Sequence, residues 1–116
     1  MDTDCVFCKI AARTIPAPLL HEDEHVIAFR DVSPQAPQHI LVIPRAHVRD
    51  LPELVRGGDE QATGHLFHVA AQVAEREGLT GPGFRLVVNT GGHGGQSVFH
   101  LHVHVLGGRN LGWPPG

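Results

Sequence analysis

The sequence predicts an α+β domain in which a mainly antiparallel sheet of five strands packs against one long helix. Two patterns carry this prediction. Short runs of β-branched and other apolar residues are separated by short polar turns, and one stretch repeats apolar residues at helical spacing. Short turns between consecutive strands favour antiparallel pairing, because parallel strands require long crossover connections. With 116 residues, the chain is predicted to form a single domain, 1–116, with a buried core.

The five strands are expected in chain order. They cover residues 19–21, 26–30, 39–43, 84–89 and 99–105. A polar turn joins the first two, and glycine- or proline-rich loops precede the third and the fifth.

Two helices are expected, one short and one long. The short one lies within 5–12, before a proline-rich segment that stops it. The long one follows a pair of glycines, with Asp59 as its N-cap residue and Gly78 as its C-terminal stop. Its apolar stripe consists of Ala62, Leu66, Val69, Ala70, Val73 and Ala74.

Composition narrows the class of protein. Charged residues make up 18% and hydrophobic residues 41% of the chain, as in a folded globular domain. The formal net charge of -3 argues against a nucleic-acid polymer as partner. No apolar run approaches the ~20 residues of a membrane span, and the acidic N-terminus does not resemble a secretory signal. We therefore expect a cytoplasmic protein with reduced thiols and no membrane partner.

The most unusual stretch is 99–105, where His100, His102 and His104 alternate with four apolar residues. A strand sends successive side chains to opposite faces, so the three imidazoles are expected on one face and the apolar groups on the other. Imidazole has an unperturbed pKa of ~6.5 and serves as nucleophile, proton carrier or metal ligand.

Three interpretations of this histidine row remain open from the residues alone. It is a half-buried strand that happens to use histidine, a catalytic zinc site with three histidine ligands, or a nucleophile with a proton donor beside it. The zinc interpretation lacks an acidic residue within the row to act as a base. In the third interpretation His102 attacks and His104 donates a proton.

A glycine-rich loop, 91–97, leads into this row and contains four glycines. Glycine allows backbone N–H groups to converge on an anion, although a flexible hairpin connection has the same composition. It is not a Walker A loop, because no Gly-Lys-Ser or Gly-Lys-Thr is present. Beside three histidines, we favour an anion-binding loop.

Several motifs in order resemble the histidine triad (HIT) superfamily and, within it, the Hint branch. They are the Asp-Val-Ser-Pro-Gln-Ala-Pro of 31–37, the His-Ile-Leu-Val-Ile-Pro of 39–44, the Gly-Gln-Ser of 95–97, the row itself, and the ending from 106 to 116. The resemblance runs from residue 5 to the end and is weakest over 49–82, where only the helix pattern corresponds.

The resemblance implies a purine nucleoside phosphoramidase, which hydrolyses the P–N bond of adenosine or guanosine 5′-phosphoramidates through a covalent nucleotidyl-histidine, without a catalytic metal. It implies that His102 attacks the α-phosphorus and that His104 contacts the phosphate and helps to protonate the departing amine. His39 is implied to orient this network, and Ser97 to hold phosphate oxygens. On chemistry alone, His39 is equally well a satisfied half-buried histidine.

The resemblance also implies ten residues that contact the substrate, of which His104 and Ser97 already have a role in the reaction. Asp31 is assigned to the ribose hydroxyls, His104 and Asn89 to the phosphate, and Gly95, Gln96 and Ser97 to the phosphate oxygens. Phe7, Ile10, Phe29 and Val32 are assigned to the slot for the base. The alternative is that Asp31 is only a turn residue and that the apolar residues are ordinary core.

The cysteines form a separate feature, Cys5-x-x-Cys8. In a reducing compartment this spacing indicates two metal ligands or a redox-active pair, and a third alternative is two reduced thiols without a function. The resemblance implies a structural zinc ion held by Cys5, Cys8, His47 and His100, and we favour this interpretation. His102 and His104 then remain for the reaction.

The resemblance also implies a homodimer in which the sheet continues across the interface and Trp113 approaches the partner's site. Two other functions stay open: a dinucleoside polyphosphate hydrolase, which uses the same nucleophile on P–O–P bonds, and a nucleotide-binding regulatory module with incidental catalysis.

Overall fold

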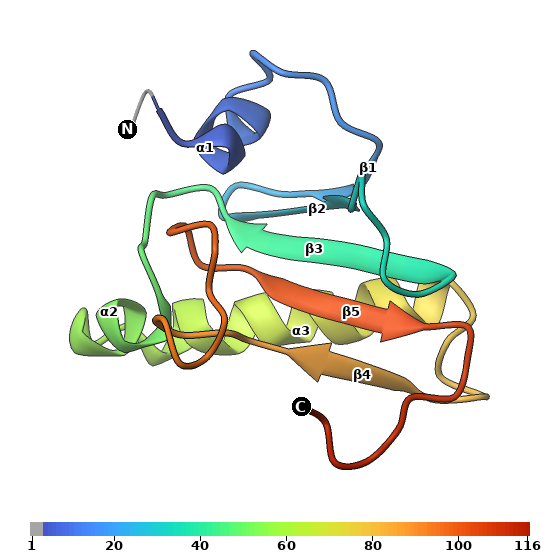
Figure 1. Cartoon of the computed structure of the whole chain (residues 1–116). Helices are drawn as coiled ribbons and strands as arrows, with labels where there is room; N and C mark the ends of the chain where they lie inside the picture. The colour runs from blue at the N-terminus through green and yellow to red at the C-terminus, as the bar shows by residue number, and fades with distance from the viewer. Residues whose placement is uncertain (1–3) are drawn as a thin grey trace.

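A computed structural model describes residues 4–116. Its centre is an antiparallel sheet in the spatial order β1-β2-β3-β5-β4 (Figure 1). The strands are β1 (Leu19–Glu22), β2 (Val26–Arg30), β3 (Gln38–Pro44), β4 (Phe84–Val87) and β5 (Val103–Gly107). Every neighbouring pair is antiparallel, which confirms the predicted α+β fold class.

The described chain contains three helices, not the two that were predicted: α1 (Val6–Ala11), α2 (Leu51–Arg56) and α3 (Glu60–Arg76). The unpredicted helix, α2, begins after Asp50, whose carboxylate accepts a hydrogen bond from the Glu53 N–H at 2.9 Å. An acidic cap followed by proline and then glutamate is a recognisable helix start, so the signal was present in the sequence. Among residues 4–116, no helix is long and apolar enough to cross a membrane.

The caps of α3 match the prediction. The Asp59 carboxylate accepts from the Ala62 N–H at 3.0 Å, which satisfies one of the unpaired donors of the first turn. At the other end Gly78 adopts a φ of 76°, and the Leu79 N–H bonds the Ala74 carbonyl at 2.9 Å. This six-to-one bond with a left-handed residue inside it is a Schellman stop, a conformation for which glycine has no steric cost.

The two faces of the sheet carry different helices. The long helix α3 lies behind the sheet in Figure 1 and buries one apolar face, whereas the short helix α1 packs on the opposite face over β2 and β3. Alternation along β3 sends Ile40 and Val42 toward α3, and Leu41 and Ile43 toward α1.

The histidine row departs from the predicted strand. Regular pairing begins only at Val103, so His100 and His102 lie in an irregular segment before β5. Leu101 is buried as predicted, but Phe99 is 51% exposed, so its expected place in the core is wrong. The β3–β5 ladder ends at the Val42–Val103 pair, and Pro44, two residues further along β3, has no N–H to resume it. Similarly, β4 ends two residues earlier than predicted.

Candidate active site and metal centre

His102 is buried, and a single hydrogen bond sets the chemistry of its ring. Its Nδ1 lies 2.7 Å from the carbonyl oxygen of His100, so Nδ1 carries the proton and donates. The basic lone pair therefore lies on Nε2. The Phe7 and His104 rings pack edge-on against it, at centroid distances of 5.1 and 4.9 Å. The arrangement leaves Nε2 as the ring nitrogen that could act as a nucleophile.

A second chain of hydrogen bonds fixes the tautomer of His104. The Gln35 backbone N–H donates to His39 Nδ1 at 3.0 Å, which places the His39 proton on Nε2. That nitrogen lies 2.8 Å from His104 Nδ1 and donates to it. His104 must then carry its own proton on Nε2, where it is a donor. Asp31 stands beside this chain, with Oδ2 3.4 Å from His39 Nε2.

Burial keeps these rings neutral. Desolvation lowers the pKa of His104 to about 4, with further lowering by His102 and His39 and opposition from Asp31. Burial also lowers the pKa of His39, against the attraction of the Asp31 carboxylate, and His102 lowers it further. At neutral pH both imidazoles are therefore uncharged, and each has the single ring proton that the hydrogen bonds above assign to it.

The glycine-rich loop, 91–97, is held closed by Gln96. Its buried carboxamide accepts from the Gly91 N–H at 2.9 Å and donates to the Arg49 carbonyl at 2.8 Å. The side chain is thus occupied within the protein, and the backbone N–H groups of Gly95 and Gln96 also bond within the loop, to the Gly92 and Gly91 carbonyls at 3.1 and 3.0 Å. Gly94 is required sterically, because a Cβ there would lie 2.4 Å from the Thr90 carbonyl oxygen.

The apolar and aromatic residues expected to contact the substrate differ in how deeply they are buried. Phe7 and Phe29 are buried and meet edge-to-face at 5.6 Å, and Ile10 packs against the same cluster. Val32 and Trp113 are 92% and 83% exposed.

The remaining three polar positions also differ in exposure. Asp31 is half-buried and accepts from the Ser33 N–H at 2.8 Å. Ser97 is exposed at the end of the loop, and Asn89 is half-buried after β4. Sequence reasoning missed the Gln35 N–H that sets the His39 tautomer, because no sequence signal gives the direction of a backbone N–H.

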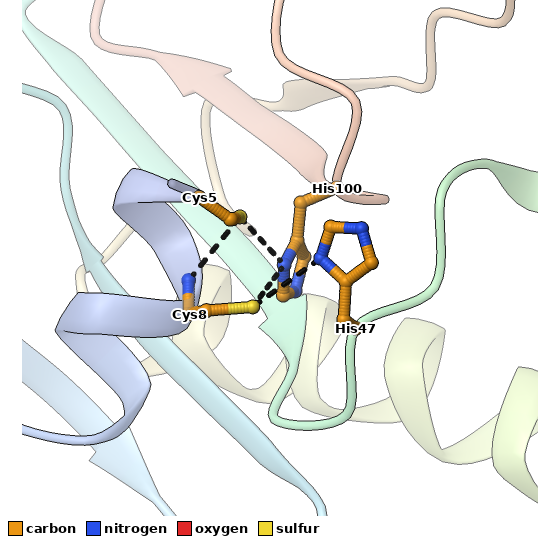
Figure 2. Close-up of side chains that lie close together, drawn as sticks. All are labelled: Cys5, Cys8, His47 and His100. Carbon is orange, nitrogen blue, oxygen red and sulfur yellow. Dashed lines mark hydrogen bonds between the residues drawn. The ribbon is translucent and has the colours of Figure 1, made fainter. Parts of the chain in front are cut away.

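Cys5, Cys8, His47 and His100 converge as predicted, and Figure 2 shows their side chains facing one another. Cys8 Sγ lies 3.2 Å from His47 Nδ1, and His100 Nδ1 lies 3.3 Å from Cys5 Sγ and 3.5 Å from Cys8 Sγ. All four donor atoms lie within 4.8 Å of one another. A tetrahedron with zinc–ligand bonds of about 2.0–2.3 Å has edges of roughly 3.3–3.8 Å, so the set fits zinc.

The tautomer of His100 also suits a ligand. Its Nε2 donates to the Pro44 carbonyl at 2.8 Å, which leaves Nδ1 unprotonated toward the two sulfurs. Burial lowers the pKa of His100 and favours the neutral ring that a metal binds. Cys5 has a second role as the N-cap of α1, since its sulfur accepts from the Cys8 N–H at 3.4 Å.

Comparison with known proteins gives a consistent result. The HIT domain family matches residues 12–111. An uncharacterized HIT-like protein of Synechococcus elongatus is 52% identical over 100% of both chains. A purine nucleoside phosphoramidase of Escherichia coli K12 is 48% identical over 97% of this chain and 93% of its own length.

The solved structures agree. A HIT family hydrolase from Legionella pneumophila superimposes with a TM-score of 0.93 at 45% identity, covering 97% of this chain and 100% of its own. A histidine triad protein from Clostridium difficile gives a TM-score of 0.91 at 40% identity, over 97% and 96% of the two chains. This chain therefore belongs to the HIT domain family.

Proposed function

We propose that this chain is a purine nucleoside phosphoramidase, which cleaves adenosine or guanosine 5′-phosphoramidates into a nucleoside monophosphate and an amine. As a member of the HIT family it is a hydrolase, and a relative at 48% identity has this activity as its name. The observation that carries the proposal is the 2.7 Å hydrogen bond from His102 Nδ1 to the His100 carbonyl, because it makes Nε2 the attacking atom.

In the first step the Nε2 lone pair of His102 attacks the α-phosphorus, and a P–N bond to the ring forms. The P–N bond to the amine breaks, and its electron pair leaves on the amine nitrogen. That nitrogen takes up a proton delivered through the His104 Nε2–H, and a proton from water replaces it. An amine leaves phosphorus readily only when its nitrogen gains a proton, which is why a donor is needed there.

In the second step water attacks phosphorus and the bond to His102 breaks. The electron pair returns to Nε2, the nucleoside monophosphate leaves, and the proton lost by water passes to solvent. His102 thus ends with its original tautomer, still fixed by the His100 carbonyl. Two successive displacements replace one difficult attack of water on the phosphoramidate.

The loop before the histidine row supplies donors for the phosphate oxygens. In the proposal, the Ser97 hydroxyl and the Asn89 amide hold those oxygens, while Gly95 and Gln96, whose N–H groups bond the Gly92 and Gly91 carbonyls, shape the loop around the phosphate. Donors fixed before the reaction stabilise the charge that builds up at phosphorus. The rigid closure of the loop by the Gln96 carboxamide supports this role.

The proposal assigns the base and the ribose to the α1 face. Phe7 and Phe29 offer an apolar wall next to His102, with Ile10 and Val32 completing the slot. Asp31, whose carboxylate borders His39, is assigned to the ribose hydroxyls.

The test compares kcat/KM for adenosine 5′-phosphoramidate with kcat/KM for a diadenosine polyphosphate, and it measures AMP binding by calorimetry. We expect the phosphoramidate to be preferred by at least tenfold. A preference for the P–O–P substrate would assign the chain to the other branch of hydrolases. Binding of AMP with negligible turnover of both substrates would indicate a regulatory module instead.

We also propose that Cys5, Cys8, His47 and His100 hold a structural zinc ion. Bound zinc would supply a fixed tetrahedral junction between α1, the segment after β3 and the histidine row. The proposed reaction takes place at His102 and requires no metal. Metal analysis of protein purified without an affinity tag tests the site: one zinc per chain is expected, and far less would contradict it.

We further infer a cytoplasmic homodimer. The outer strand β4 leaves one sheet edge unpaired in the described chain, and Trp113 lies 83% exposed on the C-terminal tail. Pairing of two β4 edges would extend the sheet and bring each tail toward the partner's site. Light scattering at micromolar concentration distinguishes a dimer from a monomer, and Trp113→Ala is expected to raise KM if the tail reaches the partner.

A further inference from the structure

The nucleophile lies where regular sheet pairing has ended. β5 pairs with β3 only as far as Val103 and Val42. If that register continued, Leu101 would lie opposite Pro44, which has no N–H for the ladder. His102 is therefore positioned by something other than the β3–β5 hydrogen bonds.

The segment 44–50, which begins at the last residue of β3, provides the missing contacts. The Pro44 carbonyl accepts from His100 Nε2 at 2.8 Å, and the Val48 carbonyl accepts from the Leu101 N–H at 2.7 Å. These bonds lie on the two residues directly before His102. They fix the backbone whose carbonyl, at His100, in turn holds the His102 ring.

The same segment also holds the glycine-rich loop. The Arg49 carbonyl accepts from Gln96 Nε2 at 2.8 Å, and Gln96 Oε1 accepts from the Gly91 N–H. Successive carbonyls at Val48 and Arg49 therefore bind the histidine row and the proposed phosphate loop. A displacement of 44–50 would disturb both together.

One side chain of segment 44–50 reaches the metal centre. His47 Nδ1 lies 3.2 Å from Cys8 Sγ, and in Figure 2 His47 and His100 approach the cysteines of α1 from different parts of the chain. The backbone of His47 is adjacent to Val48, whose carbonyl holds Leu101. The metal centre thus lies one residue from the contact that positions the nucleophile's backbone.

We propose that His47 is a positioning residue for the reaction: its coordination of zinc fixes segment 44–50, and this segment places His102 and the glycine-rich loop. The kinetic part of this inference rests on the proposed function, whereas the structural part does not. Groups that orient a site through a metal ligand change activity by ~10–100-fold when lost, and we expect an effect of that size on nucleotidyl transfer.

The test follows the Leu101 amide by hydrogen exchange and the transfer of the nucleotidyl group in single turnovers. Zinc-loaded wild type is compared with chelator-treated wild type, His47→Gln and His47→Cys. Cysteine at 47 supplies a fourth zinc ligand again and is expected to rescue both readouts. Val69→Ala, on the buried face of α3, is the control for a general loss of stability.

We expect Leu101 exchange to accelerate at least ~10-fold on chelation and in His47→Gln, relative to amides of β2, with a ~10–100-fold slower single-turnover rate. Val69→Ala should change neither the exchange of Leu101 relative to β2 nor the single-turnover rate. Exchange at Leu101 that is unaffected by zinc, or that follows global stability as in Val69→Ala, overturns the inference. Complete unfolding on zinc removal also overturns it, since the metal would then act on the whole fold.

Failure of the proposed function has a different signature. Zinc-loaded wild type would not turn over the phosphoramidate, while Leu101 exchange would still depend on zinc. Normal turnover with unchanged Leu101 exchange after chelation would instead contradict the inference alone.

Discussion

The two faces of the sheet are built from the same strands but have opposite compositions. The core of the face toward α3 is apolar, with Ile40 and Val42 of β3 beside Val103 and Val105 of β5, and at the end of β2 the polar Arg30 bonds Glu77 and Gln38. The face toward α1 carries the cysteines and the five histidines of the two sites, among them His39 on β3. Strand alternation lets adjacent residues serve stability on one side and chemistry on the other.

The difference is also one of hydrogen bonding. The buried cluster on the α3 face is held by close packing, because its side chains have no polar atoms. On the α1 face each ring nitrogen that the chemistry requires is set by a specific partner, such as the His100 carbonyl for His102 and the Gln35 N–H for His39. We therefore expect substitutions on the α3 face to alter stability and those on the α1 face to alter catalysis.

The largest expected effect is on activity at the α1 face. His102→Ala removes the proposed nucleophile, and kcat/KM should fall by about 10³-fold or more while the melting temperature stays close to wild type. The matched control is His68→Ala, an exposed histidine on α3 whose loss should leave kcat/KM unchanged. A decrease of less than tenfold in His102→Ala would assign the attack to another group.

The next effect is on stability at the α3 face. Leu66 is 1% exposed, and Leu66→Ala should lower the free energy of unfolding by about 2–5 kcal/mol through lost burial and a residual cavity. Urea unfolding measures this change, with the exposed Val55→Ala as control. Activity per folded molecule should not change, and a loss of kcat in Leu66→Ala at temperatures where it is folded would break the proposed separation of the faces.

A pH effect of similar size should come from the half-buried His104. Its pKa falls from 6.5 to about 4 on folding, so the unfolded chain binds more protons between these values. Stability contributed by this ring is therefore complete above pH 6.5 and is lost as the pH falls toward 4, by up to about 3 kcal/mol. Unfolding measured from pH 7 to pH 4 should show a shallower decline in His104→Gln, and parallel curves for the two proteins would refute the assignment.

The smallest effect tests a helix cap that belongs to neither site. Asp59→Ala removes the acceptor of the Ala62 N–H and should cost about 1 kcal/mol. Asp59→Asn retains an acceptor oxygen and should recover most of the loss. A change in kcat/KM for either variant would show that α3 contributes to catalysis and would weaken the comparison.

The success of sequence reasoning follows the same division. The spacing of apolar residues predicted α3 and its buried face, because a helix repeats its buried positions every three to four residues. The cap residues at both ends of α3 were predicted from residue type. The resemblance to the triad family brought together Cys5, Cys8, His47 and His100, which local pattern alone would not have joined across the chain.

Other features depend on three-dimensional contacts that have no local signal. Phe99 continues the alternation of the histidine row but is exposed, because the β3–β5 pairing that would carry the alternation on ends at Val42 and Val103. Gln96 looked like a phosphate ligand by motif, whereas its carboxamide bonds to Arg49 and Gly91 within the protein. Helix α2 has a recognisable N-cap residue, Asp50, but the helix was not predicted because it is short and has no long apolar stripe.

The most direct test is to trap the covalent intermediate. Wild type mixed with adenosine 5′-phosphoramidate is quenched in base, where phosphoimidazoles persist, and is mapped by peptide mass spectrometry. The proposed mechanism predicts one adenylate per chain, on His102, with none formed in His102→Ala. An adenylate on a different residue, or turnover without any adenylate in quenched samples taken before the first cycle ends, would contradict it.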